Sequence, residues 1–197
     1  MLFRSNIYNT GEVGFVLVYG QQNKKFIQNN FGNRSDITFL ELNASQLYSK
    51  NYNKMLKSRW FYSHFTKWEH ILIIQTDALL VKRIPDVYFQ TDYIGAPWNN
   101  HGKGGNGGFS LRNVSKFCSI TPRHSVDGLP NEDLYFSKQS SLKHINNYEL
   151  HKQFAVEMIY DDNPCGYHAV YKNPNFTRET WEKITTNISN KFGIDSI

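Results

Sequence analysis

The apolar run ILII at residues 71–74 constrains the fold of this chain more than any other feature. A strand covered on both faces carries consecutive apolar residues instead of an alternating pattern. The polar residues Gln75, Thr76 and Asp77 follow, and then a second apolar run, ALLV. An acid directly after a buried strand lies at the carboxyl edge of a sheet, where open α/β folds place their ligands. Asp77 is therefore a candidate binding residue, although a helix N-cap or a turn also explains an aspartate here.

Strands and helices are expected to alternate along the rest of the chain. Apolar, β-branched and aromatic runs predict strands at 14–19, 37–42, 92–98, 109–112 and 154–158. Helical spacing and capping predict helices near 21–27, over 48–68, over 114–120, from 131 onward and over 175–191. Residues 165–171 are expected to be irregular. This alternation predicts an α/β fold with a mostly parallel central sheet flanked by helices, in one domain spanning 1–197.

Composition excludes some classes of protein. With 197 residues, 40% hydrophobic and 15% aromatic, the chain can bury a core, which excludes a disordered regulator. The net charge of +5 suits nucleic acid, an anionic membrane surface or a phosphorylated small molecule. Basic residues are scattered, so nucleic acid is the least favoured partner. We see neither a signal peptide nor a membrane-spanning run, and we expect a soluble protein, with the cytoplasm favoured. Cys118 and Cys165 are too few for a disulfide framework.

A glycine-rich segment, HGKGGNGGFSLR, occupies residues 101–112. Consecutive glycines let the backbone approach a ligand closely. The segment lacks the Lys-Ser or Lys-Thr of a phosphate-binding P-loop. A flexible surface loop is the alternative, but Asn106, Gly107 and Gly108 lead straight into a predicted strand, which favours a fixed position.

Two further features carry candidate chemistry. Glu132 and Asp133 open a predicted helix, where a carboxylate serves as a hydroxyl acceptor or general base, or simply caps the helix. His168, in CGYHAVYKN, suits a metal ligand, a ring stacked on a sugar or a core histidine. One carboxylate and one histidine, together with diphosphate oxygens, would make a Mn²⁺ or Mg²⁺ site.

Taken in this order, the segments resemble glycosyltransferases of the GT-A fold, and in particular a domain family of unknown function usually grouped with them. The resemblance covers about residues 8–172 and is carried by YNKML, WEHILIIQTDALL, DYIGAPW, GNGGFSLR, the ED-containing helix and GYHAVYK. It implies a GT-A-like, Rossmann-like fold. It also implies a hexosyltransferase that moves a sugar from a UDP- or GDP-sugar to a hydroxyl group of a glycan or other acceptor.

By position, the resemblance also assigns roles to residues. Gln75 and Asp77 stand at the D-x-D motif, so Asp77 would bind Mn²⁺ or Mg²⁺ with His168 as a second ligand, and Asp133 or else Glu132 would be the base. The donor nucleotide would contact Tyr52, Asn53, Lys57, Gln75, Asp77 and Lys172. The sugar and the acceptor would contact Trp98, Asn106, Gly107, Gly108 and Tyr167, with aromatic rings stacking on sugar faces.

The sequence departs from the GT-A pattern at two places. Position 75 is Gln where the motif has an acid, which removes one negative charge from the cation site. The segment LFRSNIYN resembles the end of the first GT-A helix, so the first strand-helix unit is expected to be lacking. An alternative function follows from these departures: a degenerate GT-A-like protein that binds a nucleotide or a sugar without turnover.

Overall fold

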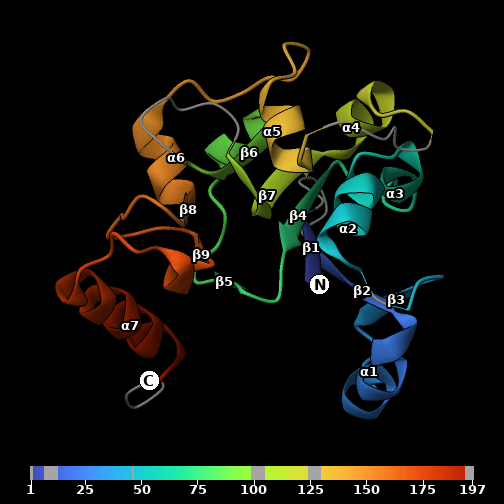
Figure 1. Cartoon of the computed structure of the whole chain (residues 1–197), viewed down its shortest axis with the longest axis horizontal. Helices are drawn as coiled ribbons and strands as arrows, with labels where there is room; N and C mark the ends of the chain where they lie inside the picture. Colours follow the sequence, from blue (N-terminus) through green and yellow to red (C-terminus); the bar gives the residue numbers. More distant parts are fainter. Residues whose placement is uncertain (1, 7–12, 46, 99–104, 124–129, 194–197) are drawn as a thin grey trace.

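The structure is a computed structural model that describes residues 2–6, 13–45, 47–98, 105–123 and 130–193 (Figure 1). Its strands are β1 (Leu2–Asn6), β2 (Val13–Gly20), β3 (Ile37–Leu42), β4 (His70–Ile74), β5 (Ala78–Leu80), β6 (Tyr93–Ala96), β7 (Asn106–Asn113), β8 (Ala155–Val156) and β9 (Gly166–His168). Its α-helices are α1 (Lys24–Phe31), α2 (Ser49–Leu56), α3 (Arg59–Ser63), α4 (Val114–Ile120), α5 (Glu132–Ser137), α6 (Tyr148–Phe154) and α7 (Arg178–Phe192). Three 3-10 helices are η1 (Gln21–Asn23), η2 (Asp86–Gln90) and η3 (Val170–Lys172).

The fold is mixed α/β, with helices flanking open sheets, as the sequence predicts. The central sheet has the order β3-β2-β1-β4-β7-β6. The prediction of a mostly parallel sheet is wrong, because β2 and β3 form the one parallel pair of this sheet and its other described pairs are antiparallel. The links from β1 to β2 and from β6 to β7 are short. A short link returns the chain beside the strand it has just left, whereas a parallel neighbour needs a crossover of about a dozen residues or more.

The N-terminal segment also differs from its prediction. Residues 2–6 form the strand β1 and not the end of a helix. This strand lies between β2 and β4 and is antiparallel to both of them. Because β1 pairs with a strand on each side, the backbone groups of β2 and β4 that face it are satisfied within the sheet.

The strand β4 is buried along its whole length, which confirms the prediction for residues 71–74. Alternate side chains face opposite ways in a strand. Ile71 and Ile73 belong to the core formed with α2 to α5, whereas Leu72 and Ile74 belong to the core formed with η2 and α6. The apolar run is therefore continuous because helices cover both faces of the sheet.

A second, smaller sheet has the order β5-β9-β8. Its strand β9 lies in the segment that was predicted to be irregular, so that prediction is wrong for residues 166–168. The helix α7 packs on this sheet, where Val81, Val156, Tyr167 and Ile184 are buried together. Figure 1 shows α7 and α1 on opposite sides of the molecule.

The helix predicted over 48–68 is two helices, α2 and α3, which meet at a break after Leu56. The Ser58 hydroxyl accepts a hydrogen bond from the backbone N–H of Phe61, so Ser58 caps α3 and starts a new helix. The helices predicted over 114–120, from 131 and near the C-terminus are confirmed. None of the helices in the described part of the chain is long and apolar enough to cross a bilayer.

Candidate functional site

A cleft of about 560 Å³ lies at one edge of the central sheet. The strands β2 and β4 end at this edge and β7 begins there, so Gly20, Gln75 and Asn106 come together. The N–H of Gln75 donates to the carbonyl oxygen of Gly108 at 2.8 Å, which ties β4 to β7. The cleft is lined by Val18, Tyr19, Gly20, Asn23, Leu47, Ser49, Tyr52, Asn53, Gln75, Thr76, Asn106, Gly108, Asn131, Glu132, Asp133, His168 and Lys172.

Asp77 lies where the chain passes from the central sheet to the small one, and its carboxylate contacts two residues that line the cleft. One oxygen, Oδ2, accepts a hydrogen bond from Lys172 Nζ at 2.9 Å, and the other, Oδ1, lies 3.5 Å from His168 Nε2. Burial raises the pKa of the Asp77 carboxyl, but Lys172 and His168 outweigh it, and the pKa is lowered below its ordinary value. Asp77 is therefore ionised at neutral pH.

His168 is buried and lies between two sets of acceptor groups. Its Nε2 atom is 3.2 Å from Gln75 Oε1, on the same side as Asp77. Its Nδ1 atom is 3.3 Å from Oε1 of Glu157. Glu157 was not predicted as a site residue. The signal that could have found it is an acid directly after the short apolar run FAV, at residues 154–156, and a similar signal marks Asp77.

The two predicted metal ligands meet in the structure. Asp77, Gln75 and His168 offer carboxylate oxygen, amide oxygen and imidazole nitrogen, a set compatible with Mn²⁺ or Mg²⁺. Within the described residues, however, no group of three or more His, Cys, Asp or Glu side chains could hold a metal ion. Asp77, Gln75 and His168 could therefore hold a cation only together with oxygens of a bound ligand.

The two acids of α5 differ in their surroundings. Glu132 is 3% exposed, and its carboxylate contacts the guanidinium of Arg112 at 2.9 and 3.0 Å. Burial raises the pKa of the Glu132 carboxyl, and Arg112 opposes this rise without cancelling it. Asp133 is half-buried and lines the cleft, and one of its oxygens accepts a hydrogen bond from Leu134 N–H at 2.7 Å. Asp133 is the better placed of the two to accept a proton from a bound hydroxyl.

Arg112 is the second residue that the sequence analysis missed. It is fully buried, and it donates to Tyr62 Oη at 2.9 Å and to Ser110 Oγ at 3.0 Å. Its one sequence signal is a charge inside the strand pattern FSLR. By holding Glu132, Arg112 fixes the start of α5 against β7.

The other predicted site residues divide into two groups. Tyr52, Asn53 and Lys172 line the cleft, and Asn53 Oδ1 accepts a hydrogen bond from the backbone N–H of Glu132. Four others, namely Lys57, Trp98, Gly107 and Tyr167, are not among the described lining residues. The Lys57 ammonium donates to the carbonyl oxygen of Pro130, and the Tyr167 hydroxyl accepts from Asn187 on α7. Residues 99–104, which include the first part of the glycine-rich segment, and residues 124–129 lie outside the described residues.

Gly107 and Gly108 are needed for close approach, but the groups that approach them belong to the protein itself. A Cβ at Gly107 would overlap the Glu132 carboxylate. A Cβ at Gly108 would overlap the imidazole of His168. The glycine pair predicted to border a ligand therefore makes room for two predicted site residues.

Gly108→Ala is expected to lower the free energy of unfolding by about 1–3 kcal/mol, because the added methyl group would collide with the imidazole of His168. Urea denaturation measures this effect. In the His168→Ala background the ring is absent, so the same substitution should cost clearly less. An equal cost in both backgrounds would contradict the steric explanation.

The fold and the cleft define a class: an α/β protein with a polar site at a sheet edge, formed around an acid, a histidine and a lysine. The chain belongs to the family described as "Protein of unknown function (DUF5672)", whose model matches residues 36–168. The matched part runs from β3 to β9 and includes Gln75, Asp77, Asp133, Glu157 and His168. Comparisons with curated proteins and with solved structures found no match.

Proposed function

We propose that this protein is a GT-A-like glycosyltransferase, which moves a sugar from a nucleotide sugar to a hydroxyl group of an acceptor with the help of a divalent cation. The observation that carries this proposal is the cleft around Asp77, His168, Lys172 and Asp133. These residues occupy the positions to which the resemblance assigns a cation, a diphosphate and a base. The family itself suggests no reaction, so the proposal depends on the site and on the resemblance.

The diphosphate of the donor would lie beside Asp77 and His168. A cation held there by Asp77, His168 and Gln75 would neutralise negative charge on the departing nucleoside diphosphate. Lys172 is the one Lys or Arg among the described residues that line the cleft, and it would contact phosphate oxygens. Its ion pair with Asp77 is exposed on the lysine side, and exposed pairs are weak, so Lys172 can exchange Asp77 for a phosphate at little cost.

The acceptor hydroxyl would lie near Asp133. Its oxygen would form a bond to the anomeric carbon while the bond from that carbon to the phosphate oxygen breaks. Asp133 would take the hydroxyl proton, and the nucleoside diphosphate would leave with the electron pair. Glu132 serves this step indirectly, because its ion pair with Arg112 fixes the start of the helix that carries Asp133.

Thermal denaturation with a panel of UDP- and GDP-sugars, with and without Mn²⁺, tests the proposal. We expect one donor to raise the melting temperature when Mn²⁺ is present and excess EDTA to remove the effect. Saturation at about 100 times Kd corresponds to about 2.7 kcal/mol of stabilisation. Release of the nucleoside diphosphate in the presence of acceptor alcohols would then demonstrate transfer. Stabilisation by none of the donors, with or without the metal, would contradict the proposal.

A second candidate function is binding of the nucleotide or sugar without turnover. Gln75 in place of an acid and Lys172 on Asp77 favour it, since both leave less negative charge to hold a cation. Nucleotide-dependent stabilisation with no release of diphosphate from any donor would support this alternative over transfer.

A further inference from the structure

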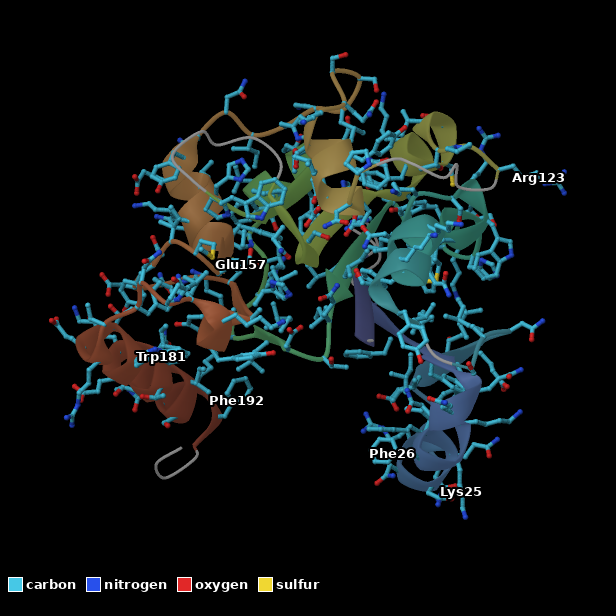
Figure 2. The ribbon with its side chains drawn as sticks, in the orientation of Figure 1. Lys25, Phe26, Arg123, Glu157, Trp181 and Phe192 are labelled. Carbon is cyan, nitrogen blue, oxygen red and sulfur yellow. The ribbon has the colours of Figure 1, made fainter. Side chains whose placement is uncertain are left out.

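Glu157 lies on the opposite side of the His168 ring from Asp77 and Gln75. The distance from Glu157 Oε1 to Nδ1 is 3.3 Å, while Asp77 Oδ1 and Gln75 Oε1 lie 3.5 and 3.2 Å from Nε2. The imidazole therefore has acceptor groups on both sides and one proton to share while it is neutral. In the view of Figure 2, Glu157 lies between α6 and α7.

We propose that Glu157 is a positioning residue: its carboxylate accepts a hydrogen bond from Nδ1–H of His168. The Nε2 atom is then unprotonated where it faces Asp77 and Gln75. The use of this Nε2 atom as a cation ligand rests on the proposed function. The position of the proton does not.

Burial supports this assignment. His168 is 5% exposed and the side chain of Glu157 is 13% exposed. Among the described contacts, both Nδ1 of His168 and Oε2 of Glu157 are buried without a hydrogen-bond partner. A buried polar atom without a partner is costly. A hydrogen bond from Nδ1–H to the Glu157 carboxylate, whose Oε1 atom lies 3.3 Å away, would satisfy the histidine.

Glu157 is itself held in place from two sides. Asn106 Nδ2 donates to Glu157 Oε1 at 2.9 Å, and Asn106 Oδ1 accepts from the N–H of Gly108 at 2.6 Å. Asn173 Nδ2 donates to the carbonyl oxygens of Glu157 and Met158 at 3.1 and 3.0 Å. These bonds connect the carboxylate to β7 and its backbone to the segment that follows η3. Glu157 is thus a fixed acceptor to which the ring can orient.

The position of the proton decides what the cleft can bind. With Nδ1–H on Glu157, the Nε2 lone pair joins Gln75 Oε1 and Asp77 Oδ1, and three acceptor atoms face one another. Such a set favours a cation, and histidines that bind metals usually donate their other N–H to a carboxylate or carbonyl. With the proton on Nε2, the ring would instead donate to Gln75 or Asp77, and no nitrogen would be left for a cation.

Nuclear magnetic resonance of the full chain with ¹⁵N-labelled histidine tests the proposal. Spectra at about pH 8, above the usual histidine pKa of about 6.5, distinguish the two neutral tautomers. A His168→Asn variant identifies the signals of His168. We expect wild-type His168 to carry its proton on Nδ1. A proton on Nε2 in the wild-type protein would overturn the proposal, and this readout needs no folded variant at position 157.

Two variants and a control test the part played by Glu157. Glu157→Leu removes the acceptor and should move the proton to Nε2, whereas Glu157→Gln retains an oxygen acceptor and should leave it on Nδ1. Glu149→Leu, on the exposed face of α6, should change nothing at His168. An unchanged tautomer in a folded Glu157→Leu variant would overturn the proposal.

Titration with Mn²⁺ alone, followed by paramagnetic broadening of the His168 signals, separates this inference from the proposed function. We expect Glu157→Leu to weaken Mn²⁺ binding by about 10–100-fold. If wild-type His168 carries its proton on Nδ1 but Mn²⁺ does not broaden its signals, the positioning role of Glu157 is supported. The proposed cation site is then contradicted. If Mn²⁺ binds equally well to wild type and to Glu157→Leu, the positioning role is overturned.

Discussion

Replacement of Arg112 by methionine is expected to lower the free energy of unfolding by about 3–5 kcal/mol, because it leaves the Glu132 carboxylate buried without its counter-charge. The Arg112 side chain is fully buried and that of Glu132 is 4% exposed. The guanidinium carbon also lies 5.4–5.7 Å from the ring centroids of Tyr93, Phe117 and Phe136. Urea denaturation followed by circular dichroism measures the loss.

A matched substitution on the surface provides the control for Arg112. Arg83 forms an exposed ion pair with Asp86, and the two side chains are 83% and 63% exposed. Arg83→Met should therefore change stability by less than about 1 kcal/mol. The double variant Arg112→Met/Glu132→Leu should recover part of the loss, because it removes both charges. If Arg112→Met costs no more than Arg83→Met, the buried pair does not stabilise the start of α5 as we describe.

Asp77→Asn is expected to reduce the rate of sugar transfer, measured as kcat/KM with Mn²⁺, by at least about 100-fold. The substitution keeps the size of the side chain but removes the negative charge that would hold the cation. Cation stabilisation of a leaving group contributes several kcal/mol, and each 1.36 kcal/mol is a factor of ten in rate. The stabilisation of the protein by the nucleotide sugar should become insensitive to EDTA in the same variant.

Asp86→Asn provides the comparison for Asp77, since Asp86 is exposed and does not line the cleft. This variant should transfer sugar at the wild-type rate. Both variants should unfold at similar urea concentrations, so that a loss of activity in Asp77→Asn reflects the site and not the fold. Wild-type kcat/KM in Asp77→Asn would refute the assignment of Asp77 to the cation.

Features with a strong local pattern could be predicted from the sequence. The strand at 71–74 is an uninterrupted apolar run, and burial on both faces leaves few other structures for such a run. The antiparallel pairing of this strand with β1 and β7 could not be predicted in this way, because each pair joins segments far apart in the chain. The helix predicted over 48–68 failed for a local reason: Ser58 caps a new helix inside a continuous helical pattern.

The candidate site could be predicted only in part. Gln75 and Asp77 follow a buried strand, and the structure brings them to His168 and Lys172 at the cleft. Arg112 is a single charge within an apolar strand pattern, and Glu157 is a single acid after a short apolar run, so neither of them belongs to a motif. The importance of each depends on the partner it meets, Glu132 for one and His168 for the other, and both partners are distant in the sequence.

The passage of the chain from the central sheet to the small sheet has a mechanical consequence. Gln75 follows a strand of the first sheet, while His168 lies on a strand of the second, so the cleft is shared between two separately hydrogen-bonded units. A ligand that contacts both units makes their separation cost more free energy than in the empty protein. By thermodynamic linkage, a substitution that lowers the free energy needed to separate the small sheet or α7 from the central sheet also weakens binding of such a ligand. The C-terminal helix α7 packs on the small sheet, so it can change the affinity for the ligand without contacting the ligand.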